Sequence, residues 1–473
     1  KGRKGPETAP PAGRAAGGQA PGGPPRPQAA TEEIQVGPSG DLHARTLVEF
    51  PGATSVSLAT AFLRDVDYYY LYGEDPARLD RRTPTRSAAA GTVARDKLAG
   101  LEPGRTYHYR LSWASRDSGA TAGGGVDFVL ADPGQFATRR APGAGFTFDI
   151  EADPHFDANS GPGVYTRTLA LMATDSPDFV MDLGDSSMVE KLASDAPGYL
   201  GRNRLVRSWW DDIGGATPFF MVVGNHDGEH GWTSPKGKPT SAEAAALRRT
   251  WLIDPRQAPK DGYSVFSDTV YAFEWGDALL VALDPYAAEA SKPTDDGWTW
   301  TLGKAQYDWL SKVLEESTAA YRMVFIHNLA GGKGSEGRGG ADWADRYEWG
   351  GLGPDGKDSF SAHRPGWAMP IHDLLRKRGV GVVFHGHDHL YAREERDGII
   401  YQTLPQPSLG RDQALDAGAL ADYGYTQGVF LPSPGYLRVT VSPARARVEY
   451  LRSADGVVAQ SYDLAPAPRN ETR

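Results

Sequence analysis

The chain contains no cysteine, and this absence removes several kinds of chemistry at once. Disulfide frameworks, thiolate zinc sites and cysteine nucleophiles are excluded. The absence does not decide the compartment, because an exported protein can fold without disulfides. The sequence also lacks any apolar run of about 18 residues or more, so no transmembrane segment is expected.

A net basic charge is missing as well: the formal charge is −10 and the isoelectric point lies near 5.6. This balance argues against a nucleic-acid-binding protein, whose phosphate contacts need a basic face. A metal site or a local basic pocket could still attract an anion. With 473 residues, 40% of them hydrophobic, the chain is long enough for two domains or for one large domain with an appendage.

Three regions differ in composition. Residues 1–40 are rich in Pro, Gly and Ala and predict a disordered tether, with a cloning or processing remnant as the alternative. Residues 41–135 contain β-prone runs separated by turns and predict a small all-β sandwich. Residues 143–465 alternate short apolar strands with helical patterns and predict an α/β fold, with β-sheets flanked by helices.

Polar side chains able to bind a metal follow five of the strands expected in residues 143–465. They are Asp153, His155, Asp185, Asn225, His327, His387 and His389. In open α/β sheets, ligands bind outside the carboxyl ends of the strands. Oxygen and nitrogen ligands without thiolate suit Zn, Fe, Mn or similar ions. Seven ligands fit two ions, and the two carboxylates would leave a site with two divalent ions net positive, as a phosphate oxyanion requires.

These motifs resemble the calcineurin-like metallophosphoesterases. The chain has D-x-H at 153–155, G-D at 184–185, G-N-H-D at 224–227, a lone His327 after a strand, and G-H-x-H at 386–389. Each motif alone is weak, but all are present in the order of the family. The resemblance implies two divalent or trivalent ions (Fe, Mn or Zn). It assigns the first ion to Asp153, His155, Asp185 and His389, and the second to Asn225, His327 and His387, with Asp185 as the bridge.

The same resemblance implies roles for His226 and Asp227. His226 would face the phosphate and protonate the leaving group or stabilise the transition state, and Asp227 would orient it. A purely structural pair is the alternative. By contrast, we expect His385 to be a buried neighbour of the ligands, because it lies within the strand before the turn.

The piece LAGLEPGRTYHYRLSW resembles the fibronectin III-like domain that precedes the catalytic domain of purple acid phosphatases, with Tyr107 as its corner tyrosine. The site departs from that family. Purple acid phosphatases have a tyrosine three residues after the bridging aspartate, where this chain has Met188, and they lack the histidine found here as His155. A ferric-tyrosinate centre is therefore not expected.

The Gly-rich segment after His327 resembles the corresponding segment of some bacterial metallophosphoesterases. One interpretation is a lid whose Arg338, Arg346 or Trp349 touches substrate, since loops after ligand-bearing strands often set specificity. A solvated surface insertion is the alternative.

The function expected from the sequence is hydrolysis of a small phosphate ester by a metal-bound hydroxide, with monoesters favoured. A phosphodiesterase on the same site is one alternative. A non-catalytic surface binding protein with a vestigial phosphoesterase domain is another, and a non-phosphate substrate on the same scaffold is a third. Because the chain begins at Lys1 and carries the tether, we expect a periplasmic or secreted protein, with a cytoplasmic location left open. The oligomeric state is not indicated.

Overall fold

The structure is a computed structural model. It describes residues 42, 46–116, 128–155, 157, 159–189, 196–213, 217–230, 240–289, 291–411 and 413–467. The predicted tether, residues 1–40, lies outside the described residues. All described residues belong to one compact unit. None of the helices described in these ranges is long and apolar enough to cross a membrane.

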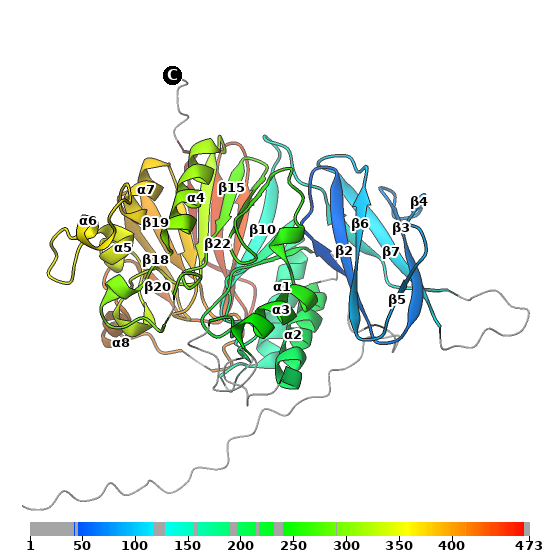
Figure 1. The fold of residues 1–473 in the computed structure, drawn as a ribbon, viewed down its shortest axis with the longest axis horizontal. Coiled ribbons are helices and arrows are strands. Elements are labelled where there is room, and N and C mark those ends of the chain that lie inside the picture. The colour runs from blue at the N-terminus through cyan, green and yellow to red at the C-terminus, as the bar shows by residue number, and fades with distance from the viewer. Residues whose placement is uncertain are drawn as a thin grey trace, which may run out of the picture. The chain divides into compact units, whose positions relative to one another are not determined.

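The N-terminal part consists of two packed β-sheets (Figure 1). One has the order β1-β2-β6; the other has the order β4-β3-β7-β8, with β5 on β3 and β9 on β7. The strands are β1 (Leu47–Glu49), β2 (Ser55–Phe62), β3 (Val66–Gly73), β4 (Arg81–Arg82), β5 (Arg86–Ala88), β6 (Thr92–Ala99), β7 (Thr106–Ser115), β8 (Val129–Leu130) and β9 (Gly134–Ala137). The predicted β-rich N-terminal region is therefore present.

Strand β7 illustrates why this region folds as a sandwich. Tyr107, Tyr109 and Leu111 alternate along the strand and are buried in the core between the two sheets, whereas Arg110 is half-buried. The hydroxyl of Tyr107 accepts a hydrogen bond from the backbone N–H of Glu102 at 2.9 Å, which is the arrangement of a corner tyrosine.

The C-terminal part contains two larger sheets. The first has the order β12-β11-β10-β21-β22-β23 and the second the order β13-β14-β15-β16-β17-β19-β18-β20. Their strands are β10 (Phe146–Glu151), β11 (Phe179–Asp182), β12 (Phe219–Met221), β13 (Tyr263–Val265), β14 (Tyr271–Trp275), β15 (Ala278–Ala282), β16 (Tyr321–Ile326), β17 (Val382–His385), β18 (Tyr391–Arg396), β19 (Ile399–Thr403), β20 (Val429–Leu431), β21 (Gly435–Val441), β22 (Ala446–Arg452) and β23 (Val458–Leu464).

Helices cover these sheets. They are α1 (Pro162–Asp175), α2 (Ala196–Trp210), α3 (Ser241–Trp251), α4 (Lys304–Glu316), α5 (Tyr347–Gly350), α6 (Phe360–His363), α7 (Ile371–Lys377) and α8 (Ala417–Tyr423). Figure 1 shows α4 and α7 in front of the eight-stranded sheet. The capping box expected at Thr240 and Glu243 is confirmed at the start of α3.

Strand β15 shows how both faces of the eight-stranded sheet become buried. Leu280 packs into the core shared with Phe148 of the six-stranded sheet. Its neighbour Val281 points to the opposite face and packs into the core that contains Leu310 of α4 and Leu374 of α7. Two stacked sheets with helices outside confirm the predicted α/β fold class.

The N-terminal sandwich shares its packing with the C-terminal part. Phe50, after β1, belongs to the same core cluster as Phe220 of β12, and their ring centroids lie 5.8 Å apart. Arg207 of α2 is fully buried and donates hydrogen bonds to the carbonyl oxygens of Ala59 and Trp251 at 2.5 and 2.7 Å. The sandwich therefore contributes to the core that it shares with the two larger sheets.

Candidate metal centre

The candidate ligands follow the carboxyl ends of strands from both sheets. In the six-stranded sheet, β10, β11 and β12 run parallel, and they lead to Asp153 and His155, to Asp185, and to Asn225. In the eight-stranded sheet, the parallel strands β16 and β17 lead to His327, and to His387 and His389. Because the two sheets pack against each other, these ends meet, and the side chains form two neighbouring groups.

The backbone at these positions is unusual. Asp153, His155, Asp185, His387 and His389 all have a positive φ, between 58° and 74°. Residues other than glycine rarely adopt this left-handed conformation, and each instance costs about 1–3 kcal/mol. Such strain concentrates where the surrounding structure holds functional side chains in fixed positions.

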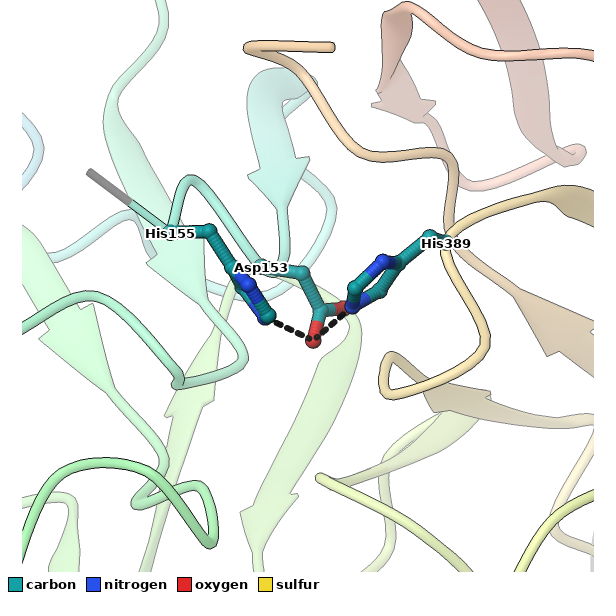
Figure 2. Close-up of side chains that lie close together, drawn as sticks. All are labelled: Asp153, His155 and His389. Carbon is teal, nitrogen blue, oxygen red and sulfur yellow. Dashed lines mark ion pairs between the residues drawn. The ribbon is translucent and has the colours of Figure 1, made fainter. Parts of the chain in front are cut away.

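The first group consists of Asp153, His155 and His389 (Figure 2). Oδ1 of Asp153 lies 3.6 Å from Nε2 of His155 and 3.5 Å from Nε2 of His389. These separations are long for hydrogen bonds, but two ligands of one ion lie roughly 3–3.5 Å apart when each is about 2.1 Å from the ion. Oδ1 of Asp153 and Nε2 of His155 are buried and have no hydrogen-bond partner within the described part of the chain. The group therefore fits a metal ion.

The second group consists of Asp185, His327 and His387, together with Asn225. Nδ1 of His327 lies 2.7 Å from the carbonyl oxygen of Leu183. A carbonyl only accepts, so Nδ1 carries the proton and a neutral ring presents a lone pair at Nε2. That Nε2 lies 3.3 Å from Oδ2 of Asp185, so two acceptors face each other unless a cation lies between them.

A proton or a metal ion can supply that cation. Burial alone would lower the pKa of His327, but the negative charges of Asp185 and Asp153 raise it to about 10. The same field attracts a divalent ion more strongly, because the ion carries two positive charges. Oδ1 of Asn225 lies 3.0 Å from Nδ1 of His387, which adds an amide oxygen to this group.

Asp185, a member of the second group, also lies next to the first group. Its Oδ2 is 3.4 Å from Nε2 of His155 in the first group and 3.3 Å from Nε2 of His327 in the second. Its Oδ1 accepts a hydrogen bond from the backbone N–H of His226 at 2.7 Å. The position of Oδ2 is the one that a carboxylate bridging two ions would need.

His226 lies beside this bridge. Its Nε2 is 3.9 Å from Oδ2 of Asp185, its ring centroid is 5.6 Å from that of His155, and its side chain is 24% exposed. The imidazole is therefore near both groups and partly open to solvent.

Asp227 lies between the turns that carry Asp185 and His226. Its carboxylate accepts backbone N–H groups at 2.8–3.0 Å from Gly224 and from the turn 185–187, and this uses both of its oxygens. Burial raises the pKa of Asp227 to about 6, against the effect of these N–H groups. Asp227 therefore ties the G-D turn to the G-N-H-D turn, and its role in orienting the ring of His226 stays a prediction.

The three loop residues predicted to touch substrate differ in position. Arg338 lies beside the turn that carries His387 and His389, and it donates a hydrogen bond to Asp388 at 2.8 Å. Arg346 pairs with Asp345 and donates to the carbonyl of Gly353, and it contacts none of the candidate ligands in the described structure. The prediction for Trp349 is wrong: its side chain is fully buried in the core and its indole N–H donates to the hydroxyl of Tyr401 at 2.9 Å.

Of two further residues noted in the sequence, His385 lies where it was expected. His385 is buried and its Nε2 lies 3.2 Å from Oγ1 of Thr403, and it belongs to neither group of candidate ligands. Met188, at the position of the purple-phosphatase tyrosine, is fully buried.

Sequence reasoning missed several polar residues behind the ligands. Tyr286, after β15, lies with its hydroxyl 3.4 Å from Oδ1 of Asn225 and hydrogen bonded to Oδ1 of Asn328. Asp388, between His387 and His389, accepts hydrogen bonds from the loop that contains Arg338. Tyr286 follows the end of a buried strand, as the candidate ligands do, so the sequence could have indicated it. Nothing in the sequence indicates the partners of Asp388.

Comparisons with known proteins agree with this geometry. The family model for calcineurin-like phosphoesterases matches residues 146–391, which is more than half of the chain. No protein sequence with a curated description matches significantly.

Two solved structures are similar in fold. A PhoD structure superimposes with a TM-score of 0.63 at 17% identity, covering 90% of this chain and 89% of PhoD. The purple acid phosphatase PPD1 from yellow lupin (Lupinus luteus) seeds has a TM-score of 0.60 at 14% identity, covering 89% of this chain and 74% of the lupin enzyme. At these identities the likeness shows the fold alone. The match of the family model to residues 146–391, on strands that bring the ligands together, shows that the chain belongs to the calcineurin-like phosphoesterase family.

Proposed function

We propose that this protein is a phosphoesterase that uses two metal ions and prefers phosphate monoesters. The observation that carries the proposal is the position of Asp185. Its Oδ2 lies within 3.4 Å of an imidazole nitrogen from each ligand group, next to buried atoms of His155 and His327 that have no hydrogen-bond partner among the described residues. Such an arrangement suits two ions that share one carboxylate.

The charge of the site supports a phosphate substrate. Asp153 and Asp185 supply about two negative charges, whereas two divalent ions supply about four positive ones, so the occupied site attracts a phosphate ester. When bound, such ions activate water and stabilise the charge that develops on the phosphoryl oxygens. The metal could be Fe, Mn or Zn, each of which accepts carboxylate and imidazole ligands.

Residues of the chain hold the reacting groups. Asp227 fixes the two turns that carry Asp185 and His226, through hydrogen bonds to their backbone. His226 is the candidate for proton transfer to the leaving group, because its imidazole lies beside Asp185 and is 24% exposed. We retain hydrolysis of a phosphodiester as the alternative reaction, since the ligand set serves either ester.

A binding protein with a vestigial phosphoesterase domain is less well supported. Decay of the site would remove ligands, yet all the predicted ones are present in the sequence and close together in the structure. The sandwich also shares core packing with the phosphoesterase-like sheets.

The experiment that tests the proposal measures metal ions per chain and turnover of an aryl phosphate monoester and an aryl phosphate diester. Wild type is compared with Asp185→Asn, His226→Ala and the exposed control Asp373→Asn. We expect two ions in wild type, loss of metal and turnover in Asp185→Asn, and normal behaviour in the control. His226→Ala should keep its metal and lose turnover by about 100-fold or more.

Less than one ion per chain after reconstitution, or turnover that survives Asp185→Asn, would contradict the two-metal proposal. Loss of metal together with turnover in His226→Ala would show that this residue has a different role.

A further inference from the structure

Asp388 lies between the candidate ligands His387 and His389, but its carboxylate is directed to the loop that follows His327. Oδ1 accepts a hydrogen bond from Nη1 of Arg338 at 2.8 Å. Oδ2 accepts from the backbone N–H of Gly339 at 2.8 Å and from the hydroxyl of Tyr425 at 2.7 Å. The side chain is buried, so each of these bonds is screened little by solvent.

Arg338 is held in one orientation by this contact. Its guanidinium carbon lies 4.4 Å from the ring centroid of Tyr423, and the side chain is 30% exposed. Its backbone pairs with that of Lys333 in both directions, at 2.7 and 3.2 Å, which closes a tight loop. Of the guanidinium nitrogens, Nη1 alone donates to a described residue, so Nε and Nη2 remain for a ligand.

The same loop is also attached to the second ligand group. The amide nitrogen of Asn328 donates to the carbonyl of Gly337 at 3.4 Å, and Oδ1 of Asn328 accepts from Tyr286, whose hydroxyl lies 3.4 Å from Asn225. The loop therefore contacts the surroundings of both Asn225 and His387. The cation of Arg338, paired with Asp388, therefore lies beside the turn that carries His387 and His389.

We propose that Arg338 binds a terminal oxygen of the substrate phosphoryl group and that Asp388 is the residue that positions it. This inference rests on the proposed phosphoesterase function and deepens it. A guanidinium ion-paired through Nη1 and packed on an aromatic ring is ordered before substrate arrives, so little conformational entropy is lost on binding. It favours a monoester, whose phosphoryl group carries one more negative charge than that of a diester.

The alternative is that Asp388 only supports the metal-ligand turn. The two roles differ in what they change. Support of the turn affects metal content, whereas positioning of Arg338 affects phosphate affinity with the metals in place.

The test uses metal-reconstituted full chain and inorganic phosphate as the probe. Calorimetry gives the phosphate Kd, elemental analysis gives metal content, and kcat and KM are measured for an aryl monoester and an aryl diester. The variants are Arg338→Gln, Arg338→Lys, Asp388→Asn and the double variant. Arg376→Gln and Asp373→Asn are matched controls, because this ion pair (Nη2 to Oδ1 at 3.4 Å) is exposed on α7.

We expect Arg338→Gln to weaken phosphate binding and to raise the monoester KM by about tenfold or more, the usual effect of losing one charge-assisted hydrogen bond. The diester KM should rise less, and Arg338→Lys should recover part of the affinity. Asp388→Asn should reproduce the defect at unchanged metal content, and the double variant should be no worse than Arg338→Gln, since the residues act as one unit.

A phosphate Kd in Arg338→Gln within about twofold of wild type would overturn the proposal. So would an Asp388→Asn variant that loses metal while its phosphate affinity, once metal is restored, equals that of wild type. If Asp388→Asn does not fold, the two Arg338 variants still decide. If the protein shows no turnover but binds phosphate in a way that depends on Arg338, the proposed enzymatic function is rejected. The anion-binding role of Arg338 is then still supported.

Discussion

A Cβ atom added at Gly386 would lie 2.5 Å from Oδ2 of Asp153. The same carboxylate oxygen accepts a hydrogen bond from the backbone N–H of His387 at 2.7 Å. Glycine is thus required before the first histidine of G-H-x-H because the turn passes directly against a candidate ligand that comes from another sheet.

Gly386→Ala should therefore displace the Asp153 carboxylate and weaken metal binding. We expect metal affinity to fall by about tenfold or more, which is the usual effect of disturbing a residue that orients a ligand. Excess metal should restore part of the activity. Metal titration of the purified variant provides the measurement. Gly163→Ala, on α1 with no atom near the added Cβ, is the control and should bind metal normally. Unchanged affinity in Gly386→Ala would contradict the steric argument.

Tyr286→Phe should weaken the second ion selectively. The hydroxyl of Tyr286 hydrogen bonds Asn328 and lies 3.4 Å from Oδ1 of Asn225, so it helps to orient that amide. We expect occupancy to fall from two ions toward one at limiting metal, with about a tenfold loss in affinity for the weaker ion. Tyr307→Phe is the matched control, because that buried tyrosine donates its hydroxyl to Met369 instead. Equal loss of both ions would argue for a general destabilisation.

Arg207→Met tests whether the sandwich and the phosphoesterase-like sheets unfold together. The substitution leaves the buried carbonyls of Ala59 and Trp251 without their donor. The free energy of unfolding of the variant should be lower than that of wild type by about 1–3 kcal/mol. Urea denaturation followed by tryptophan fluorescence and circular dichroism measures it, with the exposed Arg167→Met as control. Two separate transitions in wild type would contradict the shared core.

Glu394 should make stability depend on pH. Burial raises the pKa of Glu394 to about 8, from an ordinary value of 4.5, and Oε1 has no hydrogen-bond partner in the described part of the chain. Between these values the unfolded chain has lost a proton that the folded chain keeps. The free energy of unfolding therefore falls as the pH rises, by up to roughly 1.4 kcal/mol per pH unit.

Glu394→Gln removes this titration. The variant should match wild type near pH 4.5 and exceed it in melting temperature near pH 8. Thermal melts across this range give the comparison, and the exposed Glu395→Gln should behave like wild type. A constant difference at all pH values would show that Glu394 does not titrate in this window.

Much of the fold and of the site could be predicted because its signals are local. Each ligand motif consists of a short buried strand followed at once by Asp, Asn or His, and parallel strands carry such residues to one edge of a sheet. His385 could be separated from His387 because it lies before the glycine that ends the strand. The capping box at Thr240 was equally readable, since both of its partners lie within four consecutive residues.

The prediction for Trp349 failed because the partners of that side chain are remote in sequence. Trp349 looked like a lid residue because it follows a Gly-rich segment, but Tyr401 accepts its N–H and the core encloses its ring. Likewise, no local pattern indicated that the carboxylate of Asp227 accepts four backbone N–H groups, from Gly224 and from the turn 185–187.

The sequence by itself determined the alternation of strands and helices, the candidate ligand residues and the absence of thiol groups, since these depend on residue type and short-range pattern. Only the tertiary structure decided that Oδ2 of Asp185 lies next to histidines of both ligand groups and that Asp388 faces Arg338. Those relationships depend on how two sheets and one loop pack together. Packing brings together residues that are far apart in the chain, and short sequence patterns contain no information about such contacts.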